Sequence, residues 1–136
     1  MSNRAASKSA GRDLDAVFDQ LREILSRHAK QFTVREGHVK DKRDYHLILQ
    51  KPLIIDGRRK DELWFASIIQ QKHNVGFYFM PIYCSPEVNN QISRALLDHL
   101  DGKCCFHMTE LTPQLKKDIE ASLKVGLAAY KEKGWL

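Results

Sequence analysis

Hydrophobic and polar positions recur with two different periods along the chain, and the change of period marks its elements. Residues 13–29 carry apolar side chains three and four positions apart, which predicts a helix with a single buried stripe. Residues 30–44 are mostly polar and predict a loop or a short edge strand. The helical stripe consists of Leu14, Val17, Phe18, Leu21, Ile24 and Leu25.

Three apolar runs follow that are rich in branched and aromatic residues, which favours strands. They span residues 44–55, 62–72 and 75–83. The first two runs are separated by Asp56-Gly57 and a short basic stretch, and Asp-Gly is a strong hairpin signal. The connection between the second and third runs is even shorter. Both connections therefore predict antiparallel pairing.

The C-terminal part of the chain predicts a helix, a strand and a second helix. Ser85-Pro86 and Gly102 bracket the first helix, and Thr112-Pro113 and Gly134 bracket the last one. The strand between them covers residues 103–109. The element order α-β-β-β-α-β-α predicts an α+β fold, with a mainly antiparallel sheet of four to five strands and helices packed on one face.

Composition and charge narrow the class of protein. The chain has 136 residues, 43% of them hydrophobic, which fits one domain over residues 12–136. Residues 1–11 are small and polar, so we expect a disordered tail without a secretory signal. No apolar run approaches the roughly 20 residues of a membrane span, and three cysteines without CxxC spacing are typical of reduced thiols. These features predict a cytoplasmic protein that does not associate with membranes.

The formal net charge of +5 is a modest surplus. The basic turns around residues 39–44 and 56–62 also contain Asp or Glu, which dilutes any positive patch. Nucleic acid is therefore not the expected partner. The chain also lacks a glycine-rich phosphate loop, an HExxH pattern and a nucleophile elbow, so no catalytic residue is predicted.

The stretch GKCCFHM, residues 102–108, looks reactive because it places two cysteines beside a histidine. Side chains alternate along a strand, so Cys104, Phe106 and Met108 should face the helices. Cys105 and His107 should face the other way, with their Cα atoms about 6.5–7 Å apart. They form either a thiolate–imidazole pair or two soft ligands of a metal site whose third ligand is His46 or Tyr78. The remaining alternative is that they have no chemical role.

Both faces of the second and third strands are apolar, whereas a solvated antiparallel sheet should have a polar face. Alternation groups Trp64 with Ala66 and Ile68 on this outer surface. If the helices cover only the opposite face, the patch left bare marks a ligand or partner site; otherwise a helix crosses over and buries it. The candidate binding residues are Trp64, Tyr78, Met80, Cys105, His107 and His46. The expected partner is a small molecule or a protein, including a second copy of the chain.

Two blocks, VGFYFMPIY at residues 75–83 and GKCCFHM, together with the ending YKEKGW, are similar to the YdhG-like bacterial family. The likeness covers residues 43–135. The family is described as a domain of unknown function, with some members described as frataxin-like intracellular iron chaperones. The resemblance implies a compact domain of helices packed on an antiparallel sheet and implies little about chemistry.

The resemblance also makes iron a candidate ligand, because frataxin-like proteins are thought to hold it weakly through surface carboxylates of the first helix. Asp15, Asp19 and Glu23 lie four residues apart on one side of the predicted helix, and hard cations prefer such oxygen ligands. However, Glu23 and Arg27 are spaced as an ordinary ion pair. The basic chain also departs from the acidic surface that a cation-collecting protein needs.

Overall fold

The computed structural model describes residues 10–40 and 42–136, with side chains described from residue 13 onward. Its helical segments are α2 (Ala10–Ser26), the 3-10 turn η1 (Ala29–Gln31), α3 (Met80–Cys84), α4 (Pro86–Asn89), α5 (Arg94–Leu97) and α6 (Pro113–Glu132). Its strands are β1 (Thr33–Val39), β2 (Lys42–Leu49), β3 (Leu53–Ile55), β4 (Arg58–Lys60), β5 (Leu63–Gln70), β6 (Val75–Phe79), β7 (Leu100–Asp101) and β8 (Cys105–Met108).

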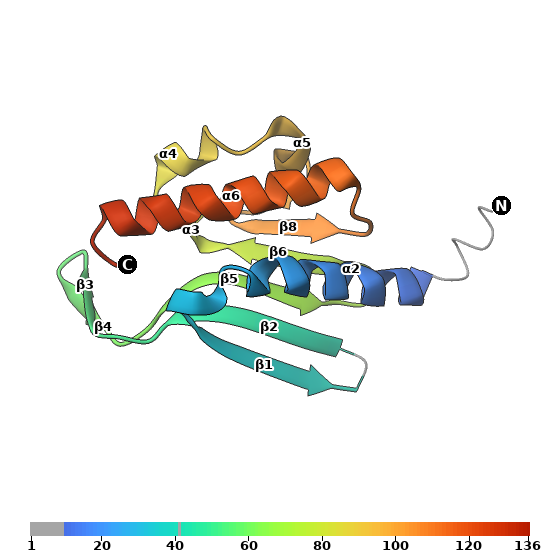
Figure 1. The fold of residues 1–136 in the computed structure, drawn as a ribbon, viewed down its shortest axis with the longest axis horizontal. Coiled ribbons are helices and arrows are strands. Elements are labelled where there is room, and N and C mark those ends of the chain that lie inside the picture. The colour runs from blue at the N-terminus through green and yellow to red at the C-terminus, as the bar shows by residue number, and fades with distance from the viewer. Residues whose placement is uncertain (1–9, 41) are drawn as a thin grey trace.

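The described strands form a six-stranded antiparallel sheet in the order β1-β2-β5-β6-β8-β7, and β3 and β4 form a separate hairpin. The helices α2 and α6 run across the same face of the main sheet, and the hairpin stands at one end (Figure 1). The α+β class and the antiparallel sheet are therefore confirmed. The sheet is larger than predicted, because residues 33–39 form a complete edge strand and β7 adds a short sixth strand.

The core lies between the sheet and the two long helices. The stripe predicted for residues 13–29 is buried along α2. Aromatic rings from the strands meet α6, with Phe65 edge-on to Tyr130 at a ring-centroid distance of 5.2 Å and to Phe79 at 5.8 Å. Phe77 packs against Phe79 and Phe106. None of the helices in the described residues has the length and apolar character needed to cross a membrane.

Local sequence signals explain where several elements begin and turn. The Thr112 hydroxyl accepts a hydrogen bond from the Leu115 N–H at 3.1 Å, and Pro113 opens α6, a favourable combination at a helix start. Asp56 and Gly57 have φ angles of 52° and 76°, which suits the tight hairpin between β3 and β4. The Asp-Gly signal thus closes this short hairpin, while β2 pairs with β5 beyond it.

Two predicted elements are shorter in the structure. The strand expected over residues 75–83 ends at Phe79, because the chain turns into α3 with Pro81 in its first turn. The helix expected between Ser85 and Gly102 is broken into α4, α5 and the strand β7. The Ser85 hydroxyl makes no cap hydrogen bond, whereas Ser93 caps α5 by accepting from the Leu96 N–H. The tail predicted over residues 1–11 lies largely outside the described residues, and α2 begins at Ala10.

A β-bulge changes which face the aromatic residues of β5 occupy. Ala66 lies opposite Leu47, but Trp64 lies opposite Ile48, so Phe65 is an extra residue in the pairing. An extra residue shifts the alternation on one side of it. Phe65 therefore joins the helix side of the sheet, and Trp64 turns to the other face. The expected grouping of Trp64 with Ala66 and Ile68 is wrong for this reason, since both of these side chains are buried in the core.

Candidate functional site

A cavity of about 950 Å³ is lined by His46, Ser67 and Tyr78 among others. These three residues are directly opposed on the sheet, on the face that α2 and α6 leave uncovered (Figure 1). Residues of β2, β5 and β6 contribute to the floor of the cavity, and the β3–β4 hairpin, α3 and the C-terminal residues contribute to its sides. Two exposed hydrophobic side chains, Ile54 and Tyr83, border it. Its aromatic and sulfur-containing lining consists of Trp64, Tyr78, Met80, Tyr83, Cys84 and Trp135.

A row of directly opposed residues crosses the sheet beneath this cavity. Arg35 of β1 lies opposite His46 of β2, which lies opposite Ser67 of β5. The row continues through Tyr78 of β6 to Cys105 of β8. Directly opposed residues of an antiparallel sheet project from the same face. The row therefore concentrates polar side chains on the face that carries the cavity.

Asp44, His46 and Ser67 form a hydrogen-bonded chain in this floor. The His46 Nε2 atom lies 2.8 Å from Asp44 Oδ2, and His46 Nδ1 lies 2.7 Å from Ser67 Oγ. The carboxylate of Asp44 only accepts hydrogen bonds, so the proton of neutral His46 belongs on Nε2. His46 Nδ1 then accepts from the Ser67 hydroxyl, so the hydrogen-bonding capacity left on Ser67 Oγ, in a residue that lines the cavity, is that of an acceptor.

The ring of Trp64 holds His46 in place from the side. The two ring centroids are 4.7 Å apart in an edge-on arrangement. On the Trp64 ring lies the guanidinium of Arg35, 5.7 Å from its centroid, and Arg35 also pairs with Glu62 at 3.5 Å. His46 is only 7% exposed. The imidazole therefore has a fixed orientation rather than a choice of rotamers.

Tyr78 lies over Gly76, where a side chain would obstruct it. A Cβ atom on Gly76 would be 2.9 Å from Tyr78 Cε1. The Tyr78 hydroxyl accepts a hydrogen bond from Gln71 Nε2 at 3.1 Å. Burial raises the pKa of Tyr78, and its contact with Cys105 raises it further. Glycine at position 76 thus allows the ring to lie flat along the cavity floor.

Cys105 and His107 project from the same face but do not act on each other. Burial raises the pKa of the Cys105 thiol above its ordinary 9.0, although a hydrogen bond with Tyr78 lowers it in part. His107 Nδ1 lies 3.4 Å from Asp101 Oδ2, outside the cavity lining. The structure thus brings His46, Trp64, Tyr78 and Met80 together at one cavity, with Cys105 beside Tyr78. His107 is not among the residues that line this cavity.

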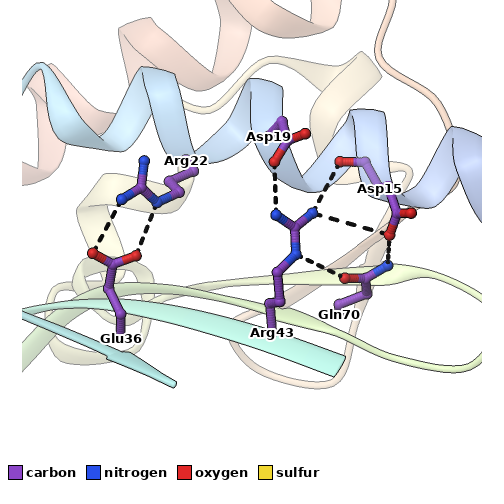
Figure 2. A network of polar contacts seen from close by, with 6 residues as sticks. All are labelled: Asp15, Asp19, Arg22, Glu36, Arg43 and Gln70. Atoms are coloured by element: carbon purple, nitrogen blue, oxygen red, sulfur yellow. Dashed lines mark hydrogen bonds and ion pairs between the residues drawn. The ribbon is translucent and has the colours of Figure 1, made fainter. Parts of the chain in front are cut away.

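The carboxylates proposed for iron already have partners. Figure 2 shows the Arg43 guanidinium between Asp19, at 2.8 Å, and the backbone carbonyl of Asp15, at 3.2 Å. The Asp15 carboxylate also accepts from Gln70 Nε2 at 2.7 Å. The Glu23 Oε2 atom lies 3.9 Å from Arg27 Nη2. Iron binding at this site stays a prediction, and it requires the cation to displace Arg43.

The same network fixes α2 on the sheet. Arg22 of α2 donates two hydrogen bonds to Glu36 of β1, at 2.9 and 3.0 Å (Figure 2). The Arg43 guanidinium also lies 4.3 Å from the ring centroid of Phe18. Within the described residues, no group of three or more His, Cys, Asp or Glu side chains is arranged to hold a metal ion. The contacts of Arg22 and Arg43 give these charges a structural role.

Sequence reasoning missed Asp44 and Ser67. Asp44 lies two residues before His46 on the same strand, and this spacing places both side chains on one face. Ser67 is the polar residue within the apolar run 63–69, and a buried polar group in such a run needs a partner. Either signal identifies a residue of the chain, but the pairing of β2 with β5 is needed to connect them.

Comparisons with known proteins give no relative for this chain. No family model matches it, and neither the curated proteins nor the solved structures contain a match. The YdhG-like resemblance therefore stays a prediction, and the function has to be argued from the geometry of the cavity.

Proposed function

We propose that the chain is a binding protein for a small, planar and largely apolar molecule that carries an N–H or O–H group. The observation that supports this proposal is the acceptor at Ser67 Oγ, which the His46–Asp44 pair fixes on the floor of an aromatic-lined cavity. An apolar pocket with a few oriented polar groups is the usual form of a small-molecule site. The ligand's donor would bind Ser67, while its ring would lie among Trp64, Tyr78 and Met80.

The size of the cavity suits such a ligand. Its volume of about 950 Å³ lies at the upper end of the roughly 300–1,000 Å³ common for small-molecule pockets. Aromatic side chains supply large contact areas with few rotamers to freeze. Ile54 and Tyr83, which line the cavity, are both exposed, so this side of the cavity faces solvent.

Charges at the cavity favour an uncharged ligand. Lys60 and Lys133 line it together with Asp56 and Glu62, so the formal charges cancel. A strongly charged ligand would leave one sign uncompensated, whereas a neutral donor satisfies Ser67 without that cost.

The Asp44–His46–Ser67 chain has the composition of a hydrolase triad, but its surroundings favour binding over acyl transfer. Acyl transfer needs hydrogen-bond donors aimed at the developing oxyanion, most often backbone N–H groups. Ser67 lies in the middle of β5, which is paired with β2 on one side and with β6 on the other. The backbone N–H groups around it are therefore used by the sheet.

A thermal-shift comparison of two nearly isosteric probes tests the proposal. Indole carries an N–H donor, and benzothiophene has the same shape without it. A ligand that binds only the native state at 100 times its dissociation constant adds about 2.7 kcal/mol of stability. We expect indole and its substituted relatives to raise the melting temperature more than their benzothiophene counterparts.

Variants make the test specific to the cavity. Ser67→Ala should remove the difference between the two probe series, and Trp64→Ala should weaken binding of both. Val39→Ala is the matched control, because Val39 is 72% exposed on β1 and does not line the cavity. The proposal fails if neither series shifts the wild-type protein, or if the shifts are equal in wild type and in both cavity variants.

The sequence predicts a homodimer through the uncovered sheet face, and the edge strand β1 offers a second contact for a partner copy. The edge strand β1 is exposed along all seven of its residues, and an uncovered edge can pair with another strand. Sedimentation velocity over a range of concentrations checks this prediction. A sedimentation coefficient that does not change with concentration and corresponds to one chain would contradict it.

A further inference from the structure

Two sulfur-bearing side chains are in contact where β6 passes into α3, and a third lies one helical turn further along α3. Met80 and Cys84 lie one turn apart in α3, so their side chains project from the same side of it, and both line the cavity. The Phe79 N–H donates to the Cys104 carbonyl at 2.8 Å, which places Cys104 beside the start of α3. Its Sγ atom is 3.9 Å from Met80 Sδ.

This spacing is the one that a shared metal ion requires. With metal–sulfur bonds of about 2.3 Å, as in zinc–thiolate sites, two ligands of a planar three-coordinate ion are about 4 Å apart. The contact between Met80 and Cys104 already has this separation. The thioether of methionine has three rotatable bonds, so it adjusts to an ion without movement of the backbone.

The two thiols are both partly buried, and they interact electrostatically. Burial raises the pKa of both Cys84 and Cys104, and the proximity of Cys84 also contributes to the shift at Cys104. Tyr130 lies next to Cys84 and donates its hydroxyl to the Trp64 carbonyl at 2.9 Å. A metal ion that binds both thiols therefore has to displace their protons.

We propose that Met80, Cys84 and Cys104 form a site for monovalent copper. Thiolate and thioether sulfurs select soft cations, and Cu(I) is the soft cation that three such ligands suit best. Binding forms two Cu–thiolate bonds and one Cu–thioether bond, releases two protons and leaves the copper oxidation state unchanged. The resulting site has one net negative charge, which the nearby Lys133 ammonium offsets. The site borders the cavity but does not use Ser67, so it does not depend on the ligand proposed above.

Competition for Cu(I) tests the site. Reduced full-length protein is titrated under anaerobic conditions into Cu(I) held by bicinchoninate, and loss of the coloured complex reports transfer to the protein. Replacing even a group that only hydrogen-bonds to a metal ligand commonly costs about 10–100-fold in metal affinity. Removing a ligand, as in Cys84→Ser or Cys104→Ser, should therefore weaken binding at least about 100-fold. Met80→Leu should have a smaller effect.

Cys105→Ser is the matched control, because Cys105 adjoins Cys104 in sequence but contacts Tyr78 on the sheet face. It should bind Cu(I) like the wild type, and so should Ser67→Ala. X-ray absorption of the loaded wild-type protein supplies a readout independent of variant folding, with a shell of three sulfur atoms expected. Equal affinity in Cys84→Ser, Cys104→Ser and Cys105→Ser, or a shell dominated by nitrogen or oxygen, would overturn the proposal.

Discussion

Replacing Gly126 with alanine should destabilise the protein, although the same change stabilises most helices. Gly126 lies in the middle of α6, where alanine is favoured over glycine by about 1 kcal/mol. An added Cβ atom, however, would be 2.6 Å from Phe79 Cζ and 2.8 Å from Pro81 Cγ. Both distances are shorter than any ordinary van der Waals contact, so one of the groups has to move.

Neither neighbour can move easily. Phe79 is fully buried, with its ring 5.8 Å from that of Phe65 and 5.7 Å from that of Phe77. Pro81 is a rigid, buried ring in the first turn of α3. Overpacking of such a core costs typically about 1–3 kcal/mol. Because two contacts are too short, the cost should exceed the gain in helix propensity, and we expect a net loss of about 1–2 kcal/mol.

Urea unfolding followed by circular dichroism measures this difference, provided that the slope with denaturant stays constant. Ala128→Gly is the control, since Ala128 is exposed on the same helix and should show the propensity term alone, a loss of about 1 kcal/mol. A Gly126→Ala variant as stable as the wild type, or more stable, would refute the close approach of α6 to Phe79 and Pro81.

Three further predictions concern the ion pairs of Arg43, the buried Tyr130 hydroxyl with the Cys84 thiol, and the Asp44–His46–Ser67 chain. Arg43→Ala should cost about 1–2 kcal/mol in urea unfolding, because it removes the ion pairs with Asp15 and Asp19 and the contact with Phe18; an unchanged midpoint would contradict the network. Burial raises the pKa of Tyr130 above its ordinary 10.0 and that of Cys84 above 9.0. The protonated forms are thus favoured in the native state. The stability that these two groups contribute should therefore be full well below pH 9 and should fall at higher pH, as the groups ionise in the unfolded chain. Tyr130→Phe should show a smaller decline above pH 10 in urea titrations, and an identical decline would argue against the burial of this hydroxyl. Finally, a fluorophosphonate probe should leave Ser67 unlabelled in intact-mass analysis, whereas stoichiometric labelling would show that the Asp44–His46–Ser67 chain activates a nucleophile.

Patterns that depend only on neighbouring residues predicted the structure well. The stripe of residues 13–29 specifies which side of α2 is buried, because a helix repeats every 3.6 residues whatever it packs against. Alternation in residues 105–108 likewise places Phe106 and Met108 in the core and Cys105 and His107 on the other face. Both patterns are local, so they can be found without knowledge of the fold.

The neighbours of Trp64 on its face of the sheet could not be predicted in the same way. Strict alternation along β5 groups it with Ala66 and Ile68, but Phe65 is an extra residue opposite the Leu47–Ile48 bond. Whether a strand carries a bulge depends on its pairing partner, and the partner strand β2 lies on the far side of the β3–β4 hairpin. The contact between Trp64 and His46 is therefore a consequence of register.

The full length of β1 could not be predicted because it is an edge strand. The break in the helix expected between Ser85 and Gly102 could not be predicted because a second capping residue lies inside that segment. All residues of β1 are exposed, so the strand has no apolar alternation from which to predict it. Between Ser85 and Gly102 the apolar spacing fits one helix, yet Ser93 caps a new helix and the chain up to Asn89 forms an earlier turn. Local side-chain hydrogen bonds of serine compete with a continuous helix.

An NMR titration with indole shows both whether a planar hydrogen-bond donor binds and where on the protein it binds. If the cavity is the site, the backbone amide signals of Ser67, Tyr78 and their neighbours in β5 and β6 shift in a saturable way. The His46 ring keeps its proton on Nε2 in the complex. Shifts confined to α2 and β1, or no shifts at saturating indole, would show that the cavity does not bind such a ligand.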